Sequence, residues 1–233
     1  AGTPWLLAHL LRQPHRCDLS RSGVIQRVVN ANLASAGPPA GVRRILHDLL
    51  GRVAWHLQTR QSVHLESAKL YELLDQVRGR REISLEQLKA HALETKLLSP
   101  CEEDGVRFSY PGFQSHWCAQ YLLDSGRAFS AHLNDITATL GRRSRVRLWE
   151  DTLVLLAGLM QCPDRLLSRI LAGSTLSHGE HVFLAARCVH EAKLADRPVG
   201  DEIIEQVVDT LIWRSTPIRE SRASVRVRAI ESL

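Results

Sequence analysis

The sequence of 233 residues has few aromatic side chains, a single methionine and no long apolar run. Phe, Trp and Tyr make up 5% of the residues, and the apolar content is mainly Leu, Ala and Val, which favours packed helices over a β-sandwich. A membrane-spanning helix needs about 18 consecutive apolar residues, and the sequence predicts none. It also lacks the features of a signal peptide. We therefore expect a mainly α-helical, cytoplasmic protein.

Cysteine pairs with metal-binding spacing are absent as well. The five cysteines are an odd number and none form a CxxC motif, so they predict neither a disulfide framework nor a zinc site. His178 and His181 do not have the i, i+4 spacing of two helical metal ligands, and we interpret this segment as a helix start. We expect free thiols and no metal site.

The positive charge of the sequence is modest and clustered. Lys and Arg number 30 against 25 Asp and Glu, and the net charge of +5 permits nucleic-acid or phosphate partners without requiring them. Arginines cluster within residues 78–81, 142–147 and 219–228. We interpret these clusters as solvated faces or contacts with acidic parts of other domains, with phosphate or nucleic-acid contact as the alternative.

Apolar residues recur at helical spacing over most of the chain. Ser84 and Gln87 have the spacing of a capping box. His47 and His56 are not neighbours on the long helix that contains them, and we interpret them as solvated or hydrogen-bonded side chains. The expected helices span residues 4–11, 22–34, 42–58, 66–77, 85–95, 112–124, 127–140, 146–161, 163–172, 179–194, 200–214 and 219–233.

The periodicity changes between residues 97 and 110. Residues 106–110 alternate as a strand does, and Asp104-Gly105 is a hairpin turn signal. Three helices followed by a hairpin is the order of a winged helix, with the hairpin as the wing. The last three predicted helices, separated by short Pro-containing turns, suggest helical-hairpin repeats.

Three further segments of the sequence stand in a characteristic order. The first is Gly2-Thr3-Pro4, the second is residues 106–122 (VRFSYPGFQSHWCAQYL), and the third is residues 148–159. In this order they resemble the Gly-x-Pro motif that opens the first helical domain, the strand-into-helix signature, and the following helix of the second helical domain in NACHT-type signalling ATPases of the STAND class. The resemblance is to the C-terminal portion of that family and covers residues 1–172.

The resemblance implies a division into four parts. Residues 1–36 are expected to form a truncated first helical domain, 42–125 the winged helix and 126–172 the second helical domain. Residues 173–233 are expected to form HEAT- or armadillo-like repeats. Since the sequence begins within a helical pattern, we expect it to be a piece of a longer protein.

The same resemblance implies a nucleotide contact. In the family the Gly-x-Pro proline packs against adenine, a role that falls to Pro4, and a winged-helix His commonly reaches the diphosphate of ADP. Tyr110 occupies that position here, so either its hydroxyl contacts phosphate or the contact is absent. ADP or ATP is the expected cofactor of the full-length protein. The chain has no GxxxxGK[ST] loop and no evident catalytic set, so alone we expect neither enzymatic activity nor a bound cofactor.

The implied function is that of a regulatory, nucleotide-sensing module. It would close over ADP or ATP on an upstream P-loop domain and link that domain to C-terminal sensor repeats. The expected partners are that P-loop domain, an unknown ligand at the repeats and further copies of the protein on activation, but neither membrane nor nucleic acid.

The alternative function is a DNA-binding winged-helix regulator. Against it, the candidate recognition helix, residues 84–96, carries no net charge. The wing tip Glu102-Glu103-Asp104 is acidic and would be repelled by DNA phosphates.

Overall fold

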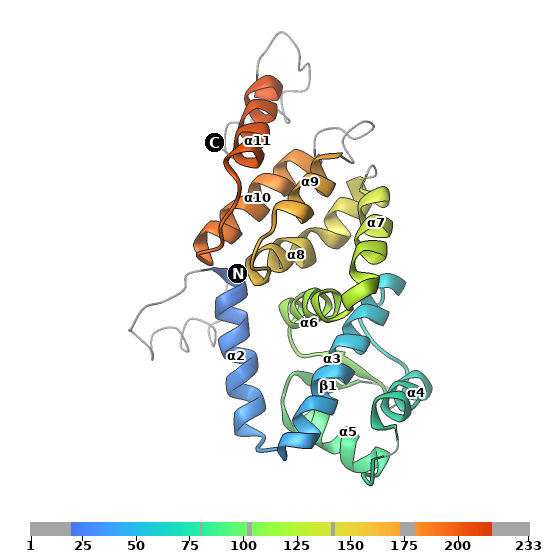
Figure 1. Ribbon diagram of the computed structural model, residues 1–233. Coiled ribbons are helices and arrows are strands. Elements are labelled where there is room, and N and C mark those ends of the chain that lie inside the picture. The colour runs from blue at the N-terminus through green and yellow to red at the C-terminus, as the bar shows by residue number, and fades with distance from the viewer. Residues whose placement is uncertain (1–19, 80, 102–103, 141–142, 173–179, 216–233) are drawn as a thin grey trace. The chain divides into compact units, whose positions relative to one another are not determined.

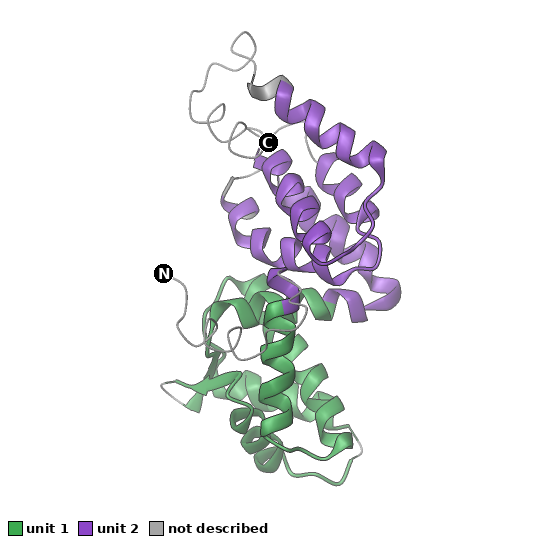
Figure 2. Ribbon diagram, turned by 90° about the vertical axis from the view of Figure 1, so that its left-hand side faces the viewer, with its two compact units in different colours: residues 1–17, 24–121 green, residues 18–23, 122–233 purple. Residues whose placement is uncertain are grey.

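The computed structural model describes the chain apart from residues 1–19, 80, 102–103, 141–142, 173–179 and 216–233 (Figure 1). The chain divides into two compact units, shown in different colours in Figure 2. Unit 1 comprises residues 1–17 and 24–121, and unit 2 comprises residues 18–23 and 122–233.

The described residues form ten α-helices, one 3-10 helix and one antiparallel hairpin, which confirms the expected mainly helical fold with a single hairpin. The predicted helices at 4–11 and 219–233 lie outside the described residues. No helix in the described part of the chain is long and apolar enough to cross a membrane. The elements are α2 (Arg21–Ser35), α3 (Ala40–Arg60), α4 (Ser67–Arg78), α5 (Leu85–Glu94), β1 (Leu98–Pro100), β2 (Val106–Phe108), α6 (Pro111–Asp124), η2 (Gly126–Ala128), α7 (Phe129–Thr139), α8 (Arg143–Leu159), α9 (Asp164–Ala172), α10 (Glu180–Leu194) and α11 (Asp201–Ser215).

Helix α3 supplies much of the core of unit 1. It packs against α4 and α5, which also contact each other. Its apolar stripe faces these helices because residues at i, i+3 and i+4 lie on one side of a helix. Burial of each Leu or Val side chain contributes about 1.5–3 kcal/mol. The fully buried residues of this stripe are Leu46, Leu49, Leu50, Val53, Ala54 and Leu57.

The hairpin of unit 1 is extended on one side by a single residue. Strands β1 and β2 pair antiparallel, with Pro100 opposite Val106. On its other edge Val106 pairs with Leu65: the Leu65 N–H donates to the Val106 carbonyl at 2.7 Å, and the Val106 N–H donates to the Leu65 carbonyl at 2.9 Å. The segment between α3 and α4 is thereby attached to the hairpin.

Helix α5 begins at the predicted capping box. The Gln87 N–H donates to Ser84 Oγ at 3.1 Å, and the Ser84 N–H donates to Gln87 Oε1 at 3.2 Å. These two bonds satisfy donors that have no partner within the helix. The prediction for this helix start is confirmed.

Helix α10 is the central helix of unit 2. It packs against α8, α9 and α11. Cys188 of α10 is fully buried, and burial raises the pKa of its thiol well above the ordinary value, so the side chain stays protonated and packs as an apolar group. The fully buried neighbours on α8 and α10 include Leu153, Leu155, Leu156, Val182 and Ala185.

Glu191 of α10 is a buried carboxylate that caps the start of α2 within unit 2. Its Oε1 accepts a hydrogen bond from the Ser22 N–H at 2.6 Å, and its Oε2 accepts one from the Arg21 N–H at 3.1 Å. A negative charge is favourable here because the N-terminus of a helix carries a partial positive charge. The Arg21 guanidinium adds an ion pair with Asp151 of α8 at 2.5 Å.

Gly158 of α8 leaves the space for this contact. A Cβ atom at position 158 would overlap Ser22 Oγ and would lie 2.9 Å from Glu191 Oε1. The Gly158 carbonyl also accepts a hydrogen bond from Arg197 Nε at 3.3 Å. Because Gly158 has no side chain, the first turn of α2 can approach α8.

We predict that Glu191→Ala destabilises unit 2. The buried N–H of Ser22 and the partly buried N–H of Arg21 would lose this acceptor, which costs about 2–3 kcal/mol in the free energy of unfolding. Urea denaturation measures this change. Glu205→Ala, on the exposed surface of α11, is the matched control and should change the free energy by less than about 0.5 kcal/mol. Equal effects of the two substitutions would contradict the capping role.

Candidate functional site

The sequence predicts two nucleotide-binding residues, and one of them, Tyr110, is among the described residues. Tyr110 lies between β2 and α6. Its side chain is half-buried, and its ring meets the Phe113 ring edge-to-face at a centroid distance of 5.6 Å. The ring also covers Gly112, where a Cβ atom would lie 3.0 Å from Tyr110 Cδ1. These contacts fix the ring at the junction of strand and helix. Pro4, the other predicted residue, lies outside the described residues.

The segment after Tyr110 enters the core of unit 1. Phe113 and Trp117 on α6 are buried, and Gln114 Nε2 donates to Gln58 Oε1 on α3 at 3.1 Å. Trp55 of α3 stacks on Tyr121 of α6 at a centroid distance of 5.4 Å. Much of the strand-into-helix signature thus has a packing role.

His116 on α6 is a buried titratable group that no sequence signal marks. It is 1% exposed, and its Nδ1 has no hydrogen-bond partner among the described residues. The His47 ring meets the adjacent Trp117 ring edge-to-face at a centroid distance of 4.5 Å. Burial, and secondarily the charge of nearby His47, lowers the pKa of His116 from 6.5 to about 4. The imidazole is therefore neutral in the folded protein near pH 7.

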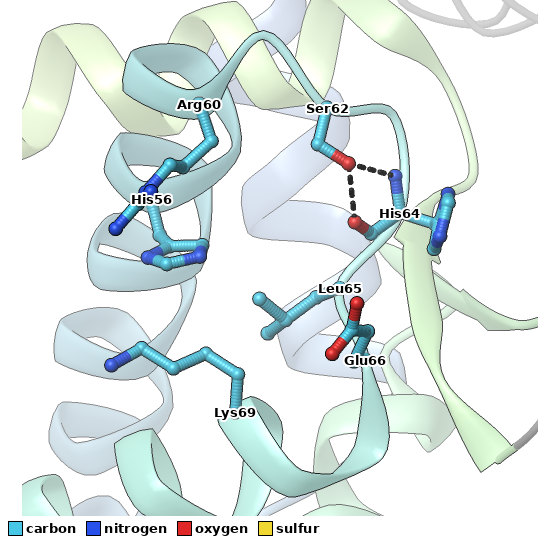
Figure 3. A pocket seen from close by; sticks show the side chains of 7 residues that line it. All are labelled: His56, Arg60, Ser62, His64, Leu65, Glu66 and Lys69. Carbon is cyan, nitrogen blue, oxygen red and sulfur yellow. Dashed lines mark hydrogen bonds between the residues drawn. The ribbon is translucent and has the colours of Figure 1, made fainter.

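A polar hollow opens in unit 1 where α3 ends and α4 begins (Figure 3). Its volume is about 410 Å³. Gln61, which ends α3, adopts φ of 58°, and this left-handed residue turns the chain toward Leu65. Ser62 Oγ then donates to the His64 carbonyl at 2.7 Å and accepts from the His64 N–H at 3.3 Å. The lining residues are His56, Arg60, Ser62, His64, Leu65, Glu66 and Lys69.

The hollow carries positive charge around His56. Figure 3 shows the His56 ring between the Arg60 and Lys69 side chains. Burial lowers the pKa of His56, the charges of Lys69 and Arg60 lower it further, and Glu72 acts in the opposite direction. Lys69 Nζ pairs with Glu72 Oε1 at 2.6 Å, and this hydrogen bond lowers the pKa of Glu72. In the described part of the chain, Arg60 has no ion-pair partner.

A second hollow, of about 580 Å³, is lined by part of the same segment. Val63, which is 76% exposed, lines it together with Cys101 and Arg107 of the hairpin. His64 and Glu66 line both hollows. The segment attached by the Leu65 bridge therefore contributes the polar residues His64 and Glu66 to both hollows and the exposed apolar side chain of Val63 to the second.

The remaining sequence candidates are scattered. His178 lies outside the described residues, whereas His181 is buried in α10. Of the acidic wing tip, Glu102 and Glu103 lie outside the described residues and Asp104 is exposed. Among the described residues, no group of three or more His, Cys, Asp or Glu side chains could hold a metal ion.

Comparisons with models of protein families, with curated proteins and with solved structures give no match for this chain.

We predict that His116 makes the stability of the protein depend on pH. The pKa of His116 is about 4 in the folded protein, whereas the ordinary value of 6.5 applies to the unfolded chain. At a pH between these two values the unfolded chain therefore binds a proton that the folded protein does not bind. Above pH 6.5 the titration of His116 does not lower the free energy of unfolding. As the pH falls from 6.5 toward 4, protonation of the unfolded chain lowers this free energy progressively. Lowering the pH from about 7.5 to about 5 should cost about 2 kcal/mol, measured by urea denaturation.

His116→Phe retains an aromatic ring of similar shape without a titrating nitrogen, so its stability should fall less over the same pH interval. His64→Gln, at an exposed position, should keep the dependence of the unaltered protein. An unchanged pH dependence in His116→Phe would contradict the assignment.

Proposed function

We propose that the chain is the regulatory, nucleotide-sensing portion of a NACHT-like STAND ATPase, and that residues 42–125 are its winged helix. The observation that carries this proposal is the pairing of Leu65 with Val106. It adds a third extended segment between the first two helices, so the order becomes α3, Leu65, α4, α5, β1 and β2. An extended segment between the first two helices, in addition to the three helices and the hairpin, supports the winged-helix assignment.

The position of Tyr110 supports a nucleotide contact in this proposal. In the family that the chain resembles, the strand-to-helix junction is turned toward the phosphates of the bound nucleotide. Tyr110 is at this junction and is half-buried, with its ring held by Gly112 and Phe113. A tyrosine hydroxyl can donate one hydrogen bond to a phosphate oxygen but has no positive charge near neutral pH. Pro4 would face the adenine in the same complex.

The helices after residue 126 support the second half of the proposal. Helix α10 contacts α8, α9 and α11, and α9 contacts α7 and α11, so helices close together in the chain are packing neighbours. Such nearest-neighbour packing is typical of helical repeats. We assign residues 126–172 to a second helical domain and residues 173–233 to HEAT-like repeats that bind an activating ligand.

In the proposed mechanism, the winged helix and helical domains close over ADP bound to an upstream P-loop domain. Ligand binding at the repeats favours exchange of ADP for ATP, and the closed arrangement opens as a rigid-body movement. Opening exposes surfaces through which several copies of the protein associate. The chain contributes the regulatory contacts and the P-loop domain contributes phosphate binding and hydrolysis.

Removal of the Tyr110 hydroxyl tests the nucleotide contact in the full-length protein. Tyr110→Phe should speed ADP release slightly, since one hydrogen bond is lost. Tyr110→His should slow release, because a protonated His makes a charge-assisted bond that is roughly twice as strong. The expected change is about 0.5–1.5 kcal/mol, measured as the dissociation rate of ADP in stopped flow.

Tyr71→Phe is the matched control for this experiment. Tyr71 also lies in unit 1, but its hydroxyl donates to Glu86 of α5 at 2.6 Å, so its loss should leave ADP release unchanged. Identical release rates for the unaltered protein, Tyr110→Phe and Tyr110→His would show that Tyr110 does not face the nucleotide.

The alternative function is a DNA-binding regulator, and the charge of α5 disfavours it. The exposed side chains of this helix include Glu86 and Glu94, and Lys89 is half-buried beside Tyr71. Glutamates on the surface that would enter the major groove are repelled by DNA phosphates. The exposed Asp104 at the turn of the wing adds to this repulsion.

We predict that the chain binds duplex DNA only weakly and without sequence preference. Electrophoretic mobility shift with an unrelated competitor duplex measures the discrimination between sequences. DNA-binding regulators prefer their site by a factor of about 10³ or more, and we expect far less. Discrimination at or above that factor at physiological salt would support the DNA-binding alternative instead.

A further inference from the structure

The hollow at the end of α3 brings three nitrogen-bearing side chains from two elements together. His56 and Arg60 are one helical turn apart on α3, and Lys69 comes from the first turn of α4. In Figure 3 the ends of the Arg60 and Lys69 side chains extend on either side of the His56 ring. Glu66 also lines the hollow, but its carboxylate lies beyond Leu65 from that ring (Figure 3).

We propose that this hollow binds a phosphate dianion, either free or as the phosphate ester of a small molecule, between Arg60, Lys69 and His56. Arg60 carries a permanent charge and five N–H donors, and Lys69 carries three. A volume of about 410 Å³ exceeds what a phosphate alone needs, since one water occupies about 30 Å³, so an ester substituent also fits. The proposal is independent of the proposed function, because neither Pro4 nor Tyr110 takes part.

Lys69 can change partner within this arrangement. Its ammonium pairs with Glu72, whose Oε1 also accepts a hydrogen bond from Gln76 Nε2 at 3.1 Å. When the Lys69 ammonium binds a phosphate instead of Glu72, Glu72 still accepts the hydrogen bond from Gln76 and remains exposed to water. This change of partner therefore leaves no buried charge without a partner. Glu72 is therefore a competitor of the ligand, and its removal should strengthen binding.

The protonation of His56 reports on occupancy. The positive charges of Lys69 and Arg60 contribute to the lowered pKa of His56 in the protein without ligand. A bound dianion opposes these charges and favours the imidazolium, so the pKa of His56 rises on binding. A protonated His56 then donates a charge-assisted hydrogen bond to the ligand.

The test is an NMR titration of the full chain with inorganic phosphate at constant ionic strength. The Cε1–H resonance of His56, identified by its loss in His56→Asn, is followed over a range of pH. We expect a saturable shift and a higher pKa of His56 in the presence of phosphate. Glycerol phosphate in a parallel titration distinguishes the ester from the free anion: tighter binding of the ester assigns the rest of the hollow to its substituent.

Three variants and one control make the test specific. Arg60→Gln and Lys69→Gln should each weaken phosphate binding about threefold to tenfold, because solvent screens these partly exposed charges. Glu72→Gln should strengthen it. Arg52→Gln, on the same helix but paired with Asp48 at 2.9 Å, should leave it unchanged. Circular dichroism and the Tm of each variant show that the fold is retained.

Two results would overturn the proposal. One is the absence of a saturable shift of the His56 resonance with either anion. The other is equal weakening by Arg52→Gln and by Arg60→Gln, which would indicate general screening by surface charge. Neither result bears on the release of ADP, so the proposed function and this inference can fail separately.

Discussion

The backbone pairing on both sides of Val106 is the constraint on which unit 1 depends. On one side of β2, Pro100 of β1 lies opposite Val106, and on the other side the N–H and the carbonyl of Val106 both bond to Leu65 in the segment between α3 and α4. A backbone hydrogen bond contributes only about 0.5–1.5 kcal/mol, but the two bonds to Leu65 fix the position of a whole connection. That connection contributes His64 and Glu66 to both hollows, and strand β2 ends shortly before Tyr110. The candidate sites of unit 1 therefore share one structural support.

The helices in the described part of the chain are predictable from sequence because their signals are local. The stripe of apolar residues on α3 and the reciprocal cap at Ser84 and Gln87 each lie within a few turns of one helix. The hairpin was also predictable, since a turn signal at Asp104-Gly105 lies beside an alternating strand. No long-range information is needed for any of these elements.

The features that define the sites depend on residues far apart in the sequence. A strand is recognised in a sequence by its alternation of apolar and polar residues. Leu65 pairs as a single residue, so no such alternation predicts its pairing with Val106. Glu191 caps a helix that begins 170 residues earlier, and nothing near it in the sequence indicates this partner. From sequence, His56 is interpreted as a solvated or hydrogen-bonded side chain. Its neighbour Lys69 cannot be recognised from sequence, because Lys69 belongs to another helix. Sequence patterns name the residue types of a site, whereas the fold decides which of them meet.

The close approach of Ser22, at the start of α2, to Gly158 of α8 limits how this chain can vary. Gly158, Ser22 and Glu191 occupy one small volume, in which the side chain at one position limits the other two. A larger residue at 158 would require a different side chain at 22, because its Cβ would overlap Ser22 Oγ, and it would also crowd the carboxylate of Glu191. These three positions should therefore change together rather than singly among related sequences, and such correlated substitution would trace the contact where overall similarity has been lost.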